Sequence, residues 1–253
     1  MDDADDPGNL ETMSKVAVSY QEIYRNGVHA LRGLGYSFAI AERSARTLAT
    51  AQAATGGAFR ALMESSQSFR GSAGERVIVK RDDPREILID CRGKSLLELS
   101  PFLIDAFAAG AHNTDDYCLT AFHWGDEVFL ADMAIRGRTV GLPITVTYQG
   151  KARRSLLSFH VSAEGISDAG PPDHTSSSDA NMLTIRTGGK KTMSAARLET
   201  TAAAWFTPDQ WLSRFDQALV RSLWIDEDEF RFFSQCVGKI WLPTSERSRK
   251  QQG

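Results

Sequence analysis

Cysteine is scarce in this sequence of 253 residues, and its three copies, Cys91, Cys118 and Cys236, stand far apart with no CxxC spacing. Disulfide frameworks and structural zinc sites depend on paired or closely spaced cysteines, so neither is expected. Free thiols are typical of a protein in a reducing compartment. The pattern therefore predicts a cytoplasmic protein.

Long apolar runs and an excess of basic charge are missing as well. No stretch approaches the roughly 20 apolar residues that a membrane-spanning helix needs. The acidic opening Met1–Pro7 lacks the basic start and apolar run of a secretory signal. The net charge of −3 gives no field that would attract nucleic acid or an anionic membrane. We expect neither as a partner.

Spacings typical of metal and nucleotide sites are absent too. The five histidines form no HxH, HxxxH or HExxH pattern, so no metal site is expected. Gly188-Gly189-Lys190 lacks the spacing of a phosphate-binding loop and is predicted to be a hairpin turn. The cofactor, if one is used, stays unknown from the residues alone.

Apolar residues make up 42% of the chain, enough for a substantial core. Ser19 and Glu22 have the spacing of a capping box, which predicts a helix that ends near Gly33. Ser37 is expected to cap a second helix, whose alanine-rich face allows another helix to approach closely. Gly56-Gly57 ends it. A helical hairpin is therefore predicted at this end.

Beyond residue 74 the apolar period changes from about 3.6 to two, which indicates strands. The segments expected to be strands are 77–79, 87–89, 118–124, 144–148, 157–161 and 182–187. Residues 95–111 are predicted to be helical, 126–139 are ambiguous between helix and strand, and 164–181 read as a polar loop. Two C-terminal helices are expected, the first from Pro208 through Leu223 and the second over 226–239.

The sequence thus predicts an α+β fold with an N-terminal helical hairpin, a central mostly antiparallel sheet and C-terminal helices. Strands on both sides of the polar loop favour a single domain over residues 18–246. An acidic lead-in over 1–17 is expected to be disordered because its aspartates repel one another. Residues 247–253 are expected to form a basic tail.

Three segments near the N-terminus resemble the opening of an uncharacterised bacterial family that is defined only as a domain of unknown function. They are Val18–Ile23, Ala30–Gly35 and Ala41–Arg46, and Trp241–Arg249 resembles the closing segment of the same family. The chain then departs from that family, because Lys250–Gly253 stands where a Gly-Ala-Gly run would continue. The resemblance implies a bacterial protein and brings no activity with it.

The same helical hairpin is similar to the N-terminal segment of the malate/L-lactate dehydrogenase family that lacks a Rossmann fold. That resemblance implies reduction of 2-oxo acids and cyclic imino acids with a nicotinamide cofactor. Members of the family carry a Ser-His-Gly catalytic motif soon after the hairpin. Here residues 54–59 read Ala-Thr-Gly-Gly-Ala-Phe, so no proton donor is carried over.

The candidate catalytic residues are His112, Asp115, Asp116 and His123. They lie on both sides of one predicted strand, and loops at strand ends commonly carry sites. In this hypothesis His112 or His123 is the acid–base group, and Asp115 or Asp116 orients it. The alternative is a polar connection between a helix and a strand, without chemistry.

Two functions follow from these observations. The first is a small-metabolite enzyme, or a subunit of one, distantly similar to 2-oxo and imino acid reductases, with a small-molecule ligand. The second is a non-catalytic binding or assembly subunit of a multiprotein complex, which the missing Ser-His-Gly motif favours. Aromatic residues gather in the last fifty residues, among them Phe232, Phe233 and Trp241. They predict a homo- or hetero-oligomer that associates through this segment.

Overall fold

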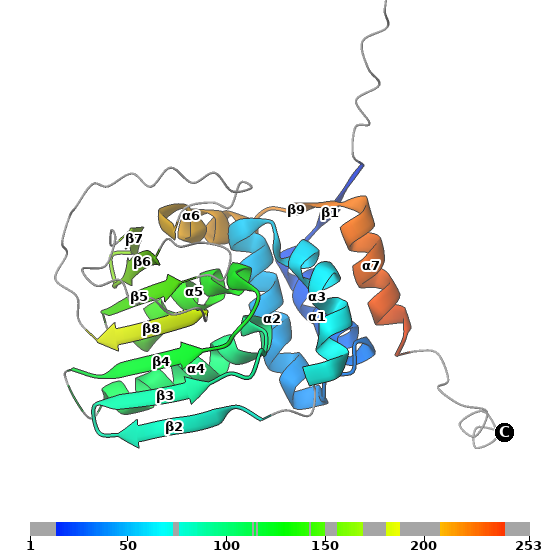
Figure 1. Ribbon diagram of the computed structural model, residues 1–253. Helices are drawn as coiled ribbons and strands as arrows, with labels where there is room; N and C mark the ends of the chain where they lie inside the picture. Colours follow the sequence, from blue (N-terminus) through cyan, green and yellow to red (C-terminus); the bar gives the residue numbers. More distant parts are fainter. Residues whose placement is uncertain are drawn as a thin grey trace, which may run out of the picture.

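The structure is a computed structural model that describes residues 14–72, 76–112, 114, 116–141, 143–149, 156–168, 181–187 and 208–240 (Figure 1). The helices are α1 (Tyr20–Gly33), α2 (Phe38–Thr55), α3 (Ala58–Ser72), α4 (Leu96–Ala111), α5 (Leu130–Val140), α6 (Pro208–Ala218) and α7 (Glu227–Gly238), with a 3-10 turn η1 (Glu127–Phe129). The strands are β1 (Lys15–Val18), β2 (Ile78–Asp83), β3 (Glu86–Asp90), β4 (Cys118–Phe122), β5 (Ile144–Gln149), β6 (Leu156–Val161), β7 (Ile166–Asp168), β8 (Met182–Thr187) and β9 (Leu223–Asp226).

The predicted helical hairpin is confirmed. The Ser19 hydroxyl accepts a hydrogen bond from the Glu22 amide, and the Glu22 carboxylate accepts one from the Ser19 amide, which completes a capping box at the start of α1. A Cβ added at Gly27 of α1 would meet the Cβ of Ala45 in α2 at 3.1 Å, so the two helices pack closely through small residues. α3 and α7 flank this pair and complete a helical layer (Figure 1).

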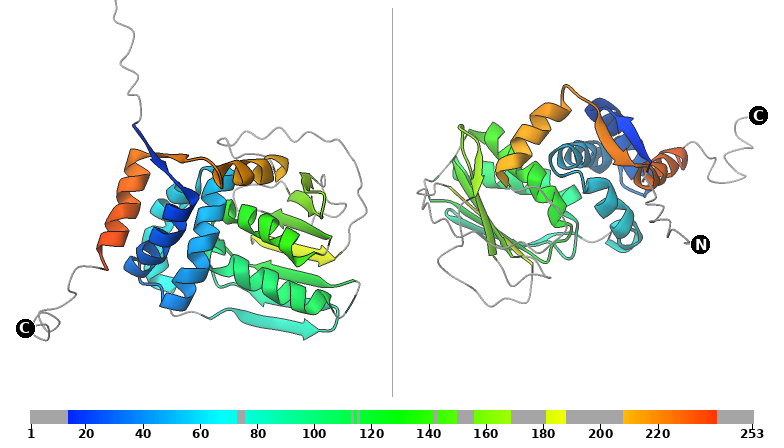
Figure 2. Two further views of the ribbon diagram at one scale, coloured as in Figure 1. Left: turned by 180° about the vertical axis from the view of Figure 1, so that it is seen from behind. Right: turned by 90° about the horizontal axis from the view of Figure 1, so that it is seen from above.

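The sheet has the strand order β2-β3-β4-β8-β5-β6-β7, and every neighbouring pair except β3 and β4 is antiparallel. This confirms the predicted α+β class with a mostly antiparallel sheet. β3 and β4 are parallel because α4 connects them as a crossover helix. α4 and α5 pack on one face of the sheet, and the view from above shows the helical layer beyond them (Figure 2). Leu119, Ala121 and Ile185 are buried on that face.

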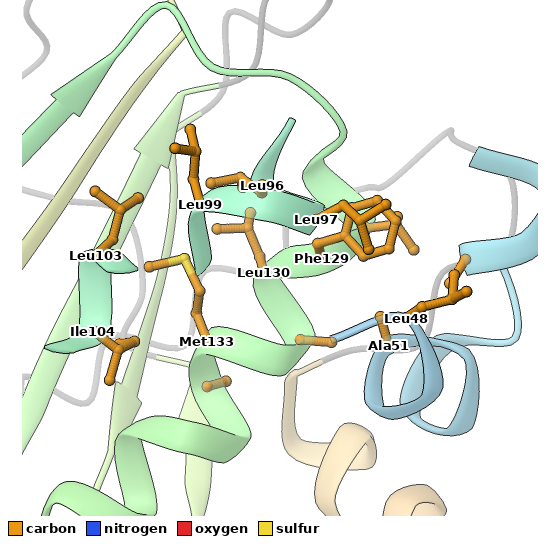
Figure 3. Close-up of a cluster of buried hydrophobic side chains, with 14 of the residues drawn as sticks. Leu48, Ala51, Leu96, Leu97, Leu99, Leu103, Ile104, Phe129, Leu130 and Met133 are labelled. Carbon is orange, nitrogen blue, oxygen red and sulfur yellow. The ribbon is translucent and has the colours of Figure 1, made fainter. Parts of the chain in front are cut away.

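The helical layer and the sheet share one hydrophobic cluster. Leu48 and Ala51 of α2 meet Leu97 of α4 and Phe129 at the end of η1, as the close-up shows (Figure 3). Each of these side chains is fully buried. Burial at this junction, at roughly 25 cal/mol for each Å² of apolar surface, holds the helices against the α4–α5 side of the sheet.

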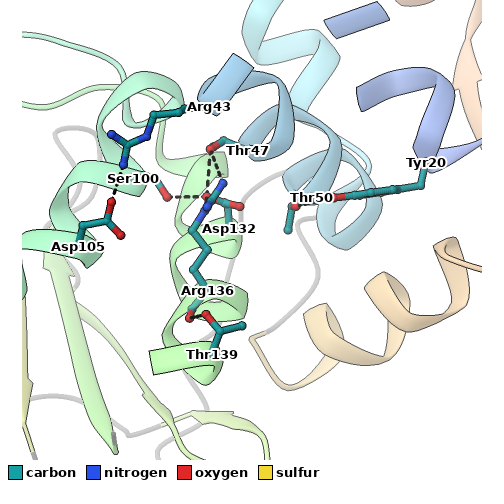
Figure 4. A network of polar contacts seen from close by, with 9 residues as sticks. All are labelled: Tyr20, Arg43, Thr47, Thr50, Ser100, Asp105, Asp132, Arg136 and Thr139. Carbon is teal, nitrogen blue, oxygen red and sulfur yellow. Dashed lines mark hydrogen bonds and ion pairs between the residues drawn. The ribbon is translucent and has the colours of Figure 1, made fainter. Parts of the chain in front are cut away.

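A polar network crosses the same junction next to the apolar contacts. Asp132 of α5 is 1% exposed; it accepts hydrogen bonds from Thr47 at 3.1 Å and Ser100 at 2.6 Å, and Arg136 donates to it at 2.7 Å (Figure 4). A buried carboxylate with three donors joins α2, α4 and α5 by directional contacts. Removal of Arg136 would leave the buried carboxylate without its charged partner, which is costly.

Several predicted boundaries need correction. Residues 15–18, which include the end of the expected lead-in, form β1 and pair with β9. The helix that begins at Pro208 ends at Ala218, so Leu223 belongs to β9 and not to that helix. Strand β7, Ile166–Asp168, lies within the segment 164–181 that was predicted to be a polar loop. Residues 127–140, which were ambiguous between helix and strand, are helical. Pairing between residues 15–18 and 223–226 overrides the local helical pattern, and sequence periodicity does not report such distant pairing.

Candidate functional site

The carboxyl ends of β3 and β4 lie side by side, because these strands run parallel with Asp90 opposite Phe122. The loops that follow, 91–95 and 123–127, are held together by backbone hydrogen bonds. The Gly93 amide donates to the His123 carbonyl at 2.6 Å. The Gly125 amide donates to the Lys94 carbonyl at 3.0 Å, and the Leu96 amide donates to the Gly125 carbonyl at 2.9 Å. Crevices outside the carboxyl ends of parallel strands are common ligand sites.

Asp90 and His123 form the most defined polar contact in these loops. His123 Nδ1 lies 3.0 Å from Asp90 Oδ1, and the Asp90 side chain is 8% exposed whereas the His123 side chain is 53% exposed. Asp90 Oδ1 also accepts a hydrogen bond from the Arg92 amide at 3.1 Å, and Lys80 Nζ lies 3.8 Å from Oδ2. A fixed carboxylate thus orients an accessible imidazole. When Nδ1 donates to the carboxylate, the neutral ring has its lone pair at Nε2.

The backbone of these loops is strained. Arg92, His123 and Asp126 have φ values of 55°, 56° and 62°, and they are the non-glycine residues with positive φ within the described part of the chain. Each costs about 1–2 kcal/mol relative to an ordinary conformation. Such residues cluster at active sites and ligand sites, where the surrounding structure holds them in place.

Two carboxyl groups in these loops have opposite pKa shifts. Burial alone would raise the pKa of Asp90, but the hydrogen bond and charge of His123, with further donors, outweigh it and hold this pKa below its usual range. For Asp126, burial raises the pKa; a hydrogen bond with Ser95 opposes this effect, and the charge of Glu64 adds to it. Burial raises the pKa of the adjacent Cys91 thiol to about 12, so this thiol is not a nucleophile at neutral pH.

The predicted catalytic residues do not gather in one place. His112 is the C-cap of α4 and Asp116 precedes β4, and both are exposed. His123 follows the other end of β4, a five-residue strand about 17 Å long. Asp115 lies outside the described residues. The structure brings His123 to Asp90 and leaves His112 and Asp116 at the opposite end of the strand.

Asp90 is absent from the predicted cluster although the sequence carries a signal for it. A predicted strand, 87–89, is followed directly by a carboxylate, and polar residues at strand ends often belong to sites. Its contact with His123 depends on the parallel register of β3 and β4 across α4. That register cannot be read from the period of the apolar residues.

The segment at residues 54–59, where the dehydrogenase motif would stand, links α2 to α3. Gly56 is the C-cap of α2 with φ 74°, a conformation in which a side chain is strained. Gln52 spans the turn: its amide group donates to the Gly56 carbonyl at 3.1 Å and its oxygen accepts from the Phe59 amide at 3.0 Å. This turn is therefore built by glycine and a buried amide, with no proton-transferring group.

A hollow with a volume of about 540 Å³ lies between β7 and α6. We name it the acidic hollow, since its charged lining residues are Glu164, Asp209 and Asp216. It includes neither Asp90 nor His123. Three carboxylates would repel the pyrophosphate of a dinucleotide, so these residues do not fit a nicotinamide cofactor.

A second hollow, of about 300 Å³, lies where α2 ends against α6 and β9. We name it the cationic hollow, because its charged lining residues are Lys15, Arg214 and Arg221. Its size is at the low end of small-molecule sites, too small for a dinucleotide. Neither Asp90 nor His123 lines this hollow either. The residues of these two hollows therefore do not fit a nicotinamide cofactor.

Within the described residues, no three His, Cys, Asp or Glu side chains gather as metal ligands would. In the same part of the chain, no helix has both the length and the apolar character needed to cross a membrane.

No protein-family model matches the sequence, and no curated protein sequence matches it. The resemblance of the chain ends to an uncharacterised bacterial family therefore stays a prediction. Solved structures do match. A malate dehydrogenase from Entamoeba histolytica has a TM-score of 0.64 at 6% identity, over 91% of this chain and 99% of that one.

Two further structures agree with the first. A malate dehydrogenase from Pyrococcus horikoshii OT3 has a TM-score of 0.63 at 9% identity, over 90% of this chain and 97% of that one. A sulfolactate dehydrogenase from Methanocaldococcus jannaschii has a TM-score of 0.60 at 8% identity, over 90% of this chain and 98% of that one. At such low identity the likeness establishes architecture and not activity. The chain has the fold of these malate and sulfolactate dehydrogenases.

Proposed function

We propose that this chain is an enzyme that acts on a small metabolite and uses His123 to transfer a proton. The observation that carries the proposal is the 3.0 Å contact between His123 Nδ1 and the buried carboxylate of Asp90. In this arrangement Nε2 accepts a proton from the substrate, and Asp90 stabilises the imidazolium that results. Asp90 is the positioning residue, in the role that the sequence assigned to Asp115 or Asp116.

The fold supports the small-metabolite part of this proposal. The names of its structural neighbours describe enzymes that act on malate and sulfolactate, which are small hydroxy acids. A 2-hydroxy acid carries a hydroxyl proton that an oriented imidazole can accept. Small hydroxy and oxo acids are therefore the first substrates to test.

The direct experiment is a screen of 2-hydroxy acids and 2-oxo acids, each with and without nicotinamide cofactors, followed for turnover. We expect turnover of one acid to fall 10²- to 10⁴-fold in His123→Ala, as is usual when an acid–base group is lost. Full activity in that variant would exclude the assignment. His112→Ala is the matched control, because it removes an exposed imidazole at the other end of β4.

A readout that needs no substrate is the nitrogen NMR spectrum of the His123 ring. We expect protonation at Nδ1 and a free Nε2 in the neutral form, because Nδ1 faces Asp90. Asp90→Asn should shift the tautomer balance. An unchanged spectrum would contradict the orienting role of Asp90.

The second candidate is a non-catalytic binding or assembly subunit, whose partners are other copies of this chain or other proteins. Two observations favour it: the turn at 54–59 has no histidine, and Leu219, Val220 and Trp224 are large exposed apolar residues near the C-terminal end. Of the predicted aromatic anchors, Phe233 is buried within the protomer, and Trp241 lies outside the described residues. Sedimentation at micromolar concentration tests this candidate; a monomer without any turnover would exclude both assembly of this chain with itself and catalysis.

A further inference from the structure

The cationic hollow lies at a meeting point of segments distant in sequence. Lys15 comes from β1, Gly56 ends α2, Arg214 is on α6 and Arg221 is in the turn that leads into β9. In Figure 1 the upper end of α2 meets α6, β9 and β1 at this place. Because three separate segments each contribute one cation, the concentration of charge comes from the fold and not from one basic run.

The floor of the hollow is held by a fixed hydrogen-bond arrangement. Gln52 is buried, and both ends of its side-chain amide are used by the turn, at Gly56 and Phe59. Arg214 Nε donates to the Ala54 carbonyl at 3.1 Å, which fixes its guanidinium at the end of α2. A site whose walls are already ordered loses less conformational entropy on binding.

The charge of the hollow contrasts with that of the whole chain. The net charge of the chain is −3, yet the described residues that line this hollow carry three cations and no carboxylate. Part of the Arg214 charge interacts with the carbonyls at the C-terminal end of α2. Lys15 and Arg221 are exposed and lie on other segments, so their charges do not serve that helix end. An anion in the hollow would be attracted by all three cations.

The rim and the size of the hollow indicate what kind of anion fits. Trp224 lines the hollow and is 67% exposed, so it offers a flat aromatic face to a ligand. A volume of about 300 Å³ fits a single small metabolite. Gly56 has no side chain to occupy the hollow, and the Arg214 guanidinium is the one group within 4 Å of a Cβ added there. A side chain at this position would also be strained, because φ is 74°.

We propose that the cationic hollow is a binding site for a small organic anion, whose carboxylate or phosphate group lies between Lys15, Arg214 and Arg221 and whose organic part contacts Trp224. This site does not depend on the proton-transfer role of His123, because neither His123 nor Asp90 lines it. Arginine binds carboxylate and phosphate through paired N–H groups, which makes Arg221 the most informative position to change.

The test is calorimetric titration of the whole chain at low ionic strength with inorganic phosphate and, separately, with malonate. We expect saturable binding of at least one of the two, and the stronger of them identifies the anionic group. Arg221→Gln should weaken binding by about tenfold, the usual effect of losing a charge-assisted hydrogen bond. Lys15→Gln should weaken it less, because a lysine contact is a point charge without paired donors.

The matched control is Arg46→Gln. Arg46 is an exposed arginine on α2 that does not line the hollow, and its replacement changes the net charge of the chain by the same amount. Equal weakening in Arg46→Gln and Arg221→Gln would overturn the proposal, since it would indicate a general charge effect. Lack of saturable binding of both phosphate and malonate at millimolar concentration would overturn it as well.

The role of Trp224 is tested with phenyl phosphate in place of inorganic phosphate. We expect phenyl phosphate to bind more tightly, and Trp224→Ala to remove that difference without changing the affinity for inorganic phosphate. An unchanged difference in Trp224→Ala would contradict the organic part of the proposal. In His123→Ala we expect anion binding to persist, so that a failure of the proposed enzymatic function and a failure of this site give different results.

Discussion

The two ends of β4 are built on different principles. At the amino end, Tyr117 is buried and its ring packs against Phe107 and over Gly110, so this end is filled by a close-packed aromatic contact. At the carboxyl end, a buried carboxylate, an accessible imidazole and a left-handed backbone occur together at Asp90 and His123. One end is organised for packing and the other carries strain and charge.

This difference explains why a cluster that is compact in sequence does not form one site. His112 and His123 are eleven positions apart, but a strand separates them, and a strand moves the chain by about 3.3 Å per residue. A residue 33 positions away, Asp90, reaches His123 instead, because the parallel neighbour of β4 ends at the same edge. Proximity at a strand end is therefore decided by sheet order.

The largest expected effect concerns the proposed proton transfer. His123→Ala should lower turnover 10²- to 10⁴-fold, while His112→Ala should change it less than threefold, because only His123 has a buried carboxylate behind it. Asp90→Asn should fall between the two, since it keeps the imidazole but removes its charged partner. Steady-state rates of the three variants check the order. An equal loss for His112→Ala and His123→Ala would contradict the contrast between the two ends.

A smaller effect, on stability, is expected at the amino end. In Gly110→Ala the new Cβ would lie 2.0 Å from the Tyr117 ring, which is buried and would have to shift. We expect a loss of about 1–3 kcal/mol in the free energy of unfolding, as is usual for overpacking. Gly238→Ala in α7 is the matched control, because no atom lies within 4 Å of its added Cβ. Urea unfolding measures both, and equal stabilities would contradict close packing at Gly110.

Backbone strain in the loops at the carboxyl end of β4 predicts that a change to glycine, and not away from it, is the more stable choice there. Arg92 has φ 55°, so Arg92→Gly should be more stable than Arg92→Ala by about 1 kcal/mol. Both variants remove the same side-chain contacts, and only glycine accepts the left-handed conformation without cost. Thermal unfolding of the pair isolates the strain. If the alanine variant were the more stable, the loops would not be strained at this position.

Local signals in the sequence were enough for much of the fold. The capping box at Ser19 and Glu22 depends on residues three apart, and it forms as predicted. The β5–β6 hairpin is predicted by alternation on two neighbouring segments, and it forms in register. Local patterns succeed here because the interacting residues are neighbours along the chain.

Pairings between distant segments could not be predicted in the same way. β1 pairs with β9 across about 200 residues, and this pairing turns a segment with helical spacing into a strand. The contact of Asp90 with His123 and the gathering of Lys15, Arg214 and Arg221 are of the same kind. Each requires the order of elements in space, which apolar periodicity does not contain.

The smallest expected effect is a dependence of stability on pH that separates two carboxyls at the same end of β4. The folded-state pKa of Asp90 is lowered, so its contribution to stability is present above the ordinary pKa of about 3.9 and is lost as the pH falls through the folded-state value. The pKa of Asp126 is raised by burial, so its contribution is present below the ordinary value and is lost as the pH rises through the folded-state value.

Asp90→Asn should therefore flatten the acid side of the stability curve, with less loss than the parent protein below about pH 4. Asp126→Asn should make the stability curve rise more steeply from acid to neutral pH. It removes the cost of ionising a buried carboxyl, and so raises stability at neutral pH relative to acid pH. Urea unfolding from acid to neutral pH measures both curves. Parallel curves for the two variants would mean that His123 does not hold Asp90 in its charged form, and the orienting pair would lose its electrostatic basis.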